Sequence, residues 1–157
     1  PIVVVTGYAQ DSVEATLADL DISLAFNPEF ASGLASSLNA GLAAMPRDVA
    51  GALVLLGDMP WIEPRLADAL IDAFLARQGA LAAIPLSEGR RGNPVLLGRR
   101  LFEAAMRLTG DEGARRLIGA LSASELVEVE TPDTGVTFDI DTPEDLAAAR
   151  RLVGGGR

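Results

Sequence analysis

The sequence predicts an α/β protein, a three-layer α/β/α sandwich with a mostly parallel, Rossmann-like sheet. Short apolar runs of strand length alternate with amphipathic helical patterns along the whole chain, which is typical of this class. Several runs are apolar at every position, which is typical of strands that are covered by helices on both faces of the sheet. No repeat or linker interrupts the pattern, and 157 residues suffice for one domain with a substantial core.

The first half of the chain predicts three strands, and each is followed by a helix. Ser32 is expected to cap the second helix, and Pro64 suits the first turn of the third. Gly41 lies inside the second helix, where glycine is unfavourable, so we expect another element to approach closely there. The expected strands are 2–6, 22–26 and 51–57, and the expected helices are 10–20, 33–45 and 64–77.

The second half continues the alternation and ends in a helix. Thr142 and Pro143 provide a cap and a first-turn proline for that helix, and Asp145 is the acid at its third position. The run 126–131 alternates in polarity, so we expect it near a sheet edge. The remaining expected elements are strands 80–86, 94–97 and 136–140, helices 99–107 and 111–121, and a frayed tail from Gly154.

Composition excludes several classes of protein. An apolar content of 49% against 22% charged residues excludes a disordered chain, and no apolar run is long enough to span a membrane. No basic and apolar leader opens the sequence, so we expect no secretion signal. The absence of cysteine suits a cytoplasmic protein. We therefore predict a cytoplasmic protein without a membrane partner.

The charged residues restrict the chemistry further. All thirteen basic residues are arginine, so histidine general-base, zinc–histidine and P-loop lysine chemistries are absent from this polypeptide. The formal charge of −9 argues against a nucleic-acid partner, because phosphate contacts need clustered positive charge. An anionic ligand must therefore be met by local arginines, by helix N-termini or by a bound cation.

Asp58 is the first candidate for chemistry. It follows the run 51–57, expected to be a central strand buried on both faces, and Pro60 prevents that strand from continuing. Open α/β sheets bind their ligands at the carboxyl ends of strands, which is where Asp58 is expected. The alternative is that Asp58 only caps its own turn or the helix at Pro64.

A second acidic cluster is formed by Asp139 and Asp141. If 136–140 is a strand, its alternation places both carboxylates on one face, where a shared divalent cation would relieve their repulsion. The alternative is that Asp139 is solvated and Asp141 supports the last helix. If Asp58 lies at the same end of the sheet, a magnesium site becomes the favoured interpretation, because Mg²⁺ takes oxygen ligands and leaves room for water and phosphate.

Two further segments are candidates for binding an anion. The adjacent Arg90 and Arg91, between glycines, could clamp a phosphate by their fork geometry; the alternative is a solvated loop. The helix start at Ser36 and Ser37 offers free backbone N–H groups and hydroxyls for an anion or a ribose. Its alternative is a helix that simply packs closely through small residues.

Six segments occur in one order over nearly the whole chain: 4–7 (VVTG), 27–38 (NPEF and GLASSL), 55–60 (LLGDMP), 89–96 (GRRGNPVL), 109–115 (TGDEGAR) and 139–146 (DIDTPEDL). In these segments the chain resembles the molybdenum cofactor nucleotidyltransferases, the MobA-like NTP transferase domains, and most closely their molybdopterin cytidylyltransferase branch. Each segment alone is weak, whereas six in this order are fairly specific. The resemblance implies a fold of the nucleotide-diphospho-sugar transferase type.

The resemblance also implies an activity and a site. Asp58, Asp139 and Asp141 would hold Mg²⁺ against the triphosphate, with Asp58 and Asp141 catalytic, and Ser36, Ser37 and Gly57 would bind the nucleotide. The loop Arg90, Arg91, Gly92, Asn93 and Pro94 would face the pterin substrate. The substrate phosphate of molybdopterin would attack the α-phosphate of CTP and expel pyrophosphate. CTP and GTP both stay open as the nucleotide, and a molybdoenzyme is allowed as a protein partner.

The chain departs from the family pattern at its beginning. The resemblance implies a first strand and a glycine-rich loop with an arginine and a lysine, and residues 1–157 contain neither that loop nor any lysine. We therefore expect a single nucleotidyltransferase-like domain that is an N-terminally truncated fragment, with the first strand missing. We also expect residues 1–157 alone to show weak or no turnover.

Three alternative functions are left open by the sequence. The run 139–142 (DIDT) also resembles the nucleophile motif of haloacid dehalogenase-like phosphatases, although that motif opens those proteins and a lysine usually follows. Sugar-phosphate nucleotidyltransferases share the expected architecture. A non-catalytic module that binds a nucleotide or cofactor without the triphosphate loop is the third alternative.

Overall fold

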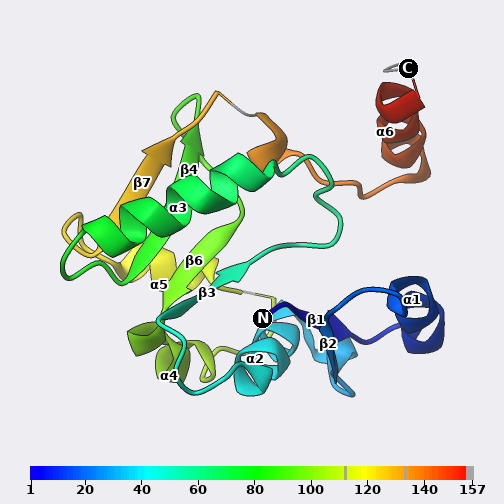
Figure 1. Cartoon of the computed structure of the whole chain (residues 1–157), viewed down its shortest axis with the longest axis horizontal. Coiled ribbons are helices and arrows are strands. Elements are labelled where there is room, and N and C mark those ends of the chain that lie inside the picture. Colours follow the sequence, from blue (N-terminus) through cyan, green and yellow to red (C-terminus); the bar gives the residue numbers. More distant parts are fainter. Residues whose placement is uncertain (112, 133, 155–157) are drawn as a thin grey trace.

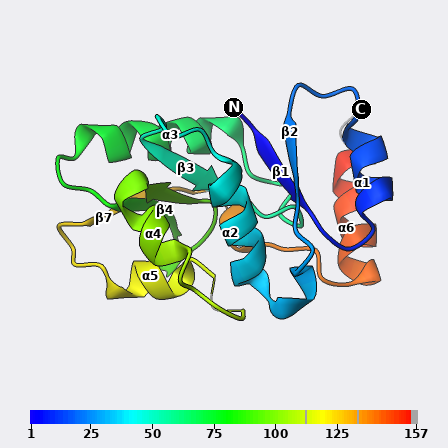
Figure 2. The ribbon, with the colours of Figure 1, turned by 90° about the horizontal axis from the view of Figure 1, so that it is seen from below.

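The computed structural model describes residues 1–111, 113–132 and 134–154, and it confirms the α/β class. A central layer of strands is covered on one face by α3 (Pro64–Ala76) (Figures 1 and 2). The other face carries α2 (Leu34–Ala44), α4 (Phe102–Ala105) and α5 (Arg115–Ala120). The three expected layers are therefore present.

The larger sheet has five strands among the described residues. Its pairs follow the order β3–β6–β4–β5, and β7 pairs with the opposite edge of β4, along Ala82 to Leu86. β6 runs antiparallel to both β3 and β4, whereas β7 runs parallel to β4, so β3, β4 and β7 share one direction. The bounds are β3 (Gly51–Val54), β4 (Ala82–Ser87), β5 (Arg90–Arg91), β6 (Val95–Gly98) and β7 (Leu126–Glu130).

A separate parallel pair is formed by β1 (Val3–Thr6) and β2 (Ser23–Phe26). The helix α1 (Gln10–Leu17) connects them and contains no buried residue. The link to the larger sheet is α2, which contacts both β1 and β2. A Cβ built on Gly41 would lie 3.1 Å from the Cγ2 of Val5, which confirms the close approach expected at this glycine.

The core divides into two clusters because successive strand residues point to opposite faces. Ala82 and Ile84 of β4 belong to a cluster with α2, α4 and α5, whereas Ala83 between them packs with α3. The same alternation occurs in β6, where Leu97 faces the first cluster and Leu96 the second. The buried, apolar composition of these strands follows from this double cover.

The expected central strand 51–57 is shorter and less central than the sequence suggested. It ends at Val54 and pairs only with β6 within the described residues, and Leu55 is 54% exposed. The prediction of burial on both faces was wrong for its last residues. The apolar sequence of a strand does not reveal whether the strand has a neighbour on both sides in the sheet.

The expected strand 136–140 is also absent. Residues Thr134–Thr137 form a 3₁₀ helix, η3, and the chain then continues without regular structure to the last helix, α6 (Pro143–Gly154). The reason is tertiary: the carbonyl of Val136 accepts a hydrogen bond from the Asn93 N–H at 2.8 Å, which ties η3 to a loop. The argument that strand alternation places Asp139 and Asp141 on one face therefore fails.

Helix ends differ from expectation in several places. Ser32 does not cap α2: it lies in the 3₁₀ helix η1 (Phe30–Ser32), its hydroxyl donates to the carbonyl of Glu29, and Gly33 is the N-cap. The expected helix 99–107 is a 3₁₀ turn, η2 (Arg99–Leu101), followed by α4, and the helix expected from 111 begins only at Arg115. The tail beyond Gly154 lies outside the described residues. No helix in the described ranges has the length and apolarity needed to span a bilayer.

Candidate functional site

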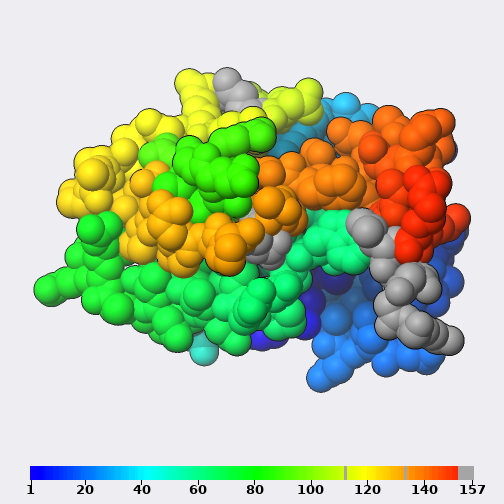
Figure 3. All heavy atoms as spheres, turned by 90° about the horizontal axis from the view of Figure 1, so that it is seen from above, coloured from blue at the N-terminus to red at the C-terminus, as the bar shows by residue number. Residues whose placement is uncertain are grey.

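The two acidic segments meet through their backbones. The N–H of Ile140 donates to the carbonyl of Asp58 at 3.0 Å, which holds the turn after β3 against the segment before α6. Figure 3 shows this segment, coloured orange, lying across the molecule beside the turn that follows β3. Asp139 and Asp141 flank Ile140, so the structure brings all three predicted acids to the same part of the molecule.

The carboxylates themselves are exposed. Asp58, Asp139 and Asp141 are all solvent-accessible, and within the described residues their side chains form no hydrogen bond or ion pair with protein. Asp58 does not cap α3, whose N-cap is Glu63, so that alternative is excluded. Among the described residues no three acidic side chains are grouped closely enough to hold a metal ion by themselves. The three acids are thus neighbours without forming a closed cage.

Space is available beside Asp58. A Cβ built on Gly57 would meet no atom within 4 Å, so this side of the turn is open. The turn is anchored from below by Met59, which is 7% exposed and donates its N–H to the carbonyl of Leu56. The turn is thus held in place and open on one side, so it has room for a bulky, charged ligand.

The position of Asp141 is fixed by the start of α6. Thr142 accepts a hydrogen bond from the N–H of Asp145 through its hydroxyl, and the Asp145 carboxylate accepts the Thr142 N–H at 3.0 Å. This reciprocal cap confirms the predicted helix start. The hydrogen bonds from Thr142 lower the pKa of the Asp145 carboxyl below its ordinary value.

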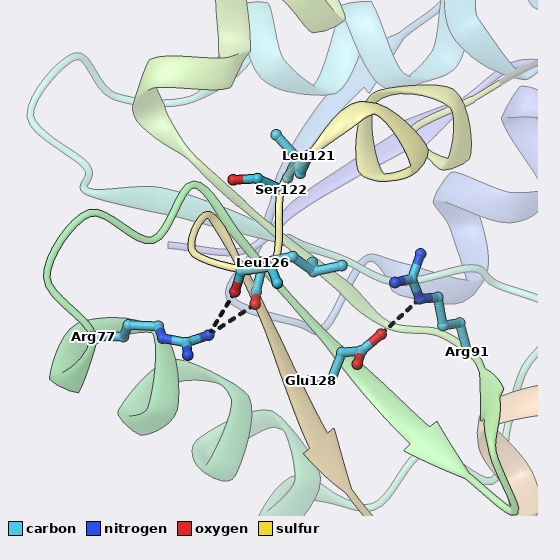
Figure 4. A pocket seen from close by; sticks show the side chains of 7 residues that line it. Arg77, Arg91, Leu121, Ser122, Leu126 and Glu128 are labelled. Carbon is cyan, nitrogen blue, oxygen red and sulfur yellow. Dashed lines mark hydrogen bonds and ion pairs between the residues drawn. The ribbon is translucent and has the colours of Figure 1, made fainter.

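The two adjacent arginines have different surroundings. Arg91 forms an ion pair with Glu128 of β7, with 2.7 Å between its Nε and the Oε1 of Glu128 (Figure 4). Arg90 lies beside it in β5, is exposed, and has no partner among the described residues. The edge strand turns Arg91 toward β7, so the two side chains have different surroundings. That both arginines clamp one phosphate stays a prediction.

The rest of this loop packs against η3. A Cβ on Gly92 would lie 2.3 Å from the carbonyl oxygen of Val136, so only glycine fits, and Asn93 donates its N–H to the same carbonyl. Pro94 is buried. A continuous series of contacts therefore runs from the loop 90–94 through η3 and the segment 139–141 to the turn at Asp58.

The start of α2 differs from the predicted anion site. The N–H of Leu34 donates to the Asp111 carboxylate at 3.3 Å, and the N–H of Ala35 donates to the carbonyl of Gly110 at 2.9 Å. The N–H of Ser36 bonds to the carbonyl of Gly33. The N–H groups of Leu34 and Ala35, which we expected to be free to bind an anion, are thus hydrogen-bonded to the loop at Gly110 and Asp111. The role of Asp111 was missed because this residue lies far from α2 in the sequence.

Sequence reasoning also missed the role of Asn27. This residue is 3% exposed, and its side-chain amide donates to the hydroxyls of Ser36 at 2.8 Å and Ser37 at 3.1 Å. A depression of about 480 Å³ opens beside it, between η1, α2 and the 106–110 segment. Asparagine before proline at the end of a strand was the available signal, but it was explained as a turn.

The α/β/α sandwich is that of the nucleotide-diphospho-sugar transferase fold, whose members with similar structures are nucleotidyltransferases. The chain belongs to one family within it: the model of the MobA-like NTP transferase domain matches residues 1–126. The resemblance stated from the sequence is thereby confirmed.

Individual relatives agree with this assignment. The chain is 28% identical over 155 residues to the molybdenum cofactor cytidylyltransferase of Escherichia coli K12, covering 95% of this chain and 73% of the relative. The solved Rv0371c homologue from Mycobacterium sp. strain JC1 superposes with a TM-score of 0.79 at 27% identity, over 99% of this chain and 76% of that one. A manganese complex of Rv0371c from Mycobacterium tuberculosis H37Rv gives a TM-score of 0.75 at 25% identity, over 97% and 77%.

Proposed function

We propose that this chain is a cytidylyltransferase of molybdenum cofactor maturation, which transfers CMP from CTP to molybdopterin and releases pyrophosphate. The observation that carries the proposal is the hydrogen bond between Ile140 and Asp58, since it brings two acidic segments far apart in sequence to one open surface. The similarity to the Escherichia coli cytidylyltransferase supports CTP as the nucleotide.

The donor set suits a magnesium ion delivered with the nucleotide. Mg²⁺ is usually held by one or two carboxylates together with substrate phosphates and water, so a closed cage of three acids is not required. Asp58 and one of the pair Asp139 and Asp141 would hold it, and the bound ion would neutralise charge on the phosphates. The manganese complex of a relative supports a divalent ion in this family.

The protein's own part is mainly to position the reactants. An oxygen of the molybdopterin phosphate forms a bond to the α-phosphorus of CTP, and the bond between the α-phosphorus and the bridging oxygen breaks, which releases pyrophosphate. We assign the acceptor phosphate to Arg90, which has no partner among the described residues, whereas Arg91 is paired with Glu128. Gly92 and Asn93 hold that loop against η3. Ser37 and Gly57 are the residues assigned to the nucleotide.

The test is binding of CTP with and without Mg²⁺, followed by thermal stabilisation and by calorimetry. Asp58→Asn should weaken Mg²⁺-dependent CTP binding about tenfold or more, since one charged ligand of the ion is removed. Its stability should stay near wild type, because the structural contact of Asp58 is its backbone carbonyl. Asp72→Asn is the control: an exposed acid in α3 with the same charge change.

Product formation separates transfer from binding alone. Incubation with CTP, Mg²⁺ and molybdopterin should give slow CMP transfer, because the chain contains no lysine to place beside the triphosphate. CTP binding that is indifferent to Mg²⁺, or equal in the Asp58 and Asp72 variants, would overturn the proposed site. Stabilisation by CTP with no product at any enzyme concentration would favour the non-catalytic module.

A further inference from the structure

Asn27 occupies an unusual position for a loop residue. It lies just after β2, and its backbone N–H donates to the carbonyl of Thr6 at 2.8 Å, which ties it to the end of β1. Its side chain is almost fully buried, yet every polar atom of its amide has a partner. A buried amide with all its hydrogen bonds satisfied has a single orientation and imposes it on its neighbours.

The orientation of this amide follows from one backbone group. The N–H of Glu29 donates to the Oδ1 of Asn27 at 2.9 Å, and because a backbone N–H can only donate, that atom must be the oxygen. The amide nitrogen therefore faces α2, where it lies 2.8 Å from the Ser36 Oγ and 3.1 Å from the Ser37 Oγ. Both amide hydrogens are used, one on each serine.

This arrangement makes acceptors of both hydroxyl oxygens, so each hydroxyl hydrogen must point elsewhere. The hydrogen of Ser36 has protein acceptors, the carbonyls of Gly33 at 2.8 Å and Glu29 at 2.9 Å. Ser37 differs: in the described part of the chain its hydroxyl forms no hydrogen bond to an acceptor. Ser37 is half-buried in the first turn of α2, on the face that also carries Gly41 and contacts β1.

We propose that Asn27 is a positioning residue that turns Ser37 into a dedicated hydrogen-bond donor to the nucleotide, and that Ser36 serves only to hold the turn. The inference rests on the proposed function, and it divides the serine pair that the sequence treated as equivalent. The ligand atom must be a hydrogen-bond acceptor, which is either an oxygen or ring nitrogen of the base and sugar or an oxygen of the phosphates.

The test compares three variants by calorimetric titration with CTP and Mg²⁺. Ser37→Ala deletes the donor and should weaken CTP binding about three- to tenfold, the usual effect of one hydrogen bond. Asn27→Asp keeps the shape but presents acceptors to both serines, so Ser37 donates inward and the same loss is expected. Ser36→Ala should lower the melting temperature while leaving CTP affinity within about twofold.

The double variant separates positioning from simple charge repulsion. If Asn27 acts through Ser37, then Asn27→Asp made in the Ser37→Ala protein should cost less than about twofold in affinity, because the donor is already gone. If the added carboxylate merely repels the nucleotide, its effect persists in that background and overturns the proposal. Equal losses for Ser36→Ala and Ser37→Ala overturn it as well.

Inorganic triphosphate with Mg²⁺ identifies the acceptor. A loss confined to CTP in Ser37→Ala supports an acceptor on the base or sugar, and an equal loss for triphosphate supports one on the phosphates. No loss with either ligand overturns the inference.

A ligand-free crystal structure, together with the binding data, distinguishes failure of the Asn27–Ser37 inference from failure of the proposed function. If wild type binds no nucleotide, the proposed function fails, whereas the inference fails if the Ser37 hydroxyl donates to a protein acceptor. An ordered water accepting from Ser37 supports it.

Discussion

At the scale of single residues, the function proposed here depends on side chains whose partners come from distant parts of the chain. The Asp58 carboxylate stays exposed because only its backbone is engaged, by Ile140. Arg91, in contrast, is engaged by Glu128, whereas Arg90 beside it has no partner among the described residues. The sequence shows which chemical group each residue carries, but not whether that group is free to contact a ligand or is already engaged by another residue.

Two independent features of the structure require glycine at position 33. Its φ of +112° is a conformation that side chains rarely adopt, and a Cβ there would lie 2.4 Å from the carbonyl carbon of Gly110. We expect Gly33→Ala to lower the free energy of unfolding by about 2 kcal/mol or more, measured by urea denaturation. Gly119→Ala is the control, because that helical site is open and alanine should be neutral or slightly stabilising. Equal stability of both variants would refute the docking of the 109–111 loop on α2.

At the scale of elements, the site is assembled by contacts between pieces with little regular structure. The loop after β5 packs on η3, and the segment after η3 pairs with the turn after β3. A displacement at one contact should therefore be felt at the next. The elements that carry the acids are positioned by this series rather than by strand pairing.

Gly92→Ala tests that series. The added Cβ would lie 2.3 Å from the Val136 carbonyl oxygen, so η3 must shift away from the loop. We expect a lower melting temperature together with a several-fold weaker Mg²⁺-dependent CTP binding, although residue 92 is no metal ligand. Gly79→Ala is a comparison that involves backbone strain alone, because its φ is +88° and no atom lies within 4 Å. Loss of stability with unchanged CTP affinity would show that η3 does not position the acids.

The cap of α6 predicts a pH dependence. The pKa of Asp145 is lowered in the folded protein by its hydrogen bonds from Thr142, so its ionised form favours folding. This contribution is complete above the unfolded aspartate pKa of about 3.9 and is lost as pH falls through the lower folded value. We expect the difference in melting temperature between wild type and Asp145→Asn to be present at pH 6 and to shrink in acid. A difference that is constant from pH 6 to pH 3 would contradict this cap.

At the scale of the whole molecule, stability is unevenly distributed. The five-stranded sheet is covered on both faces by helices and contains the fully buried side chains of Ile84 and Leu97. In the part of the chain that the structure describes, the sheet of β1 and β2 has two strands. It relies on α2 for cover, while α1 buries no residue. A two-stranded sheet is only marginally stable without further packing.

Hydrogen exchange followed by mass spectrometry should show this difference directly. Amides of β1, β2 and α1 should exchange much faster than those of β4, β6 and β7, because local opening exposes little apolar surface there. CTP with Mg²⁺ should slow exchange at the end of β2, where Asn27 contacts α2. Uniform protection of both sheets would show that they open as a single unit.

The sequence by itself determined the fold class and the family, and it pointed to the acids on which the proposed site rests. Alternating apolar runs and helical periodicities encode the layers, and the motifs around Asp58 and Asp141 are local, so both could be read without coordinates. The cap at Thr142 was predictable for the same reason, since it involves residues three apart.

Only the tertiary structure decided where strands stop, which donors are free and which side chains meet. Leu55 is apolar yet exposed because the strand before it pairs on one side only within the described residues, and η3 replaces a strand because it packs on a loop. Likewise, Asp111 reaches α2 and Asn27 orders Ser36 and Ser37 across separations that no local pattern records. Hydrogen bonds are short-ranged in space, not in sequence, and for that reason the site had to be seen folded.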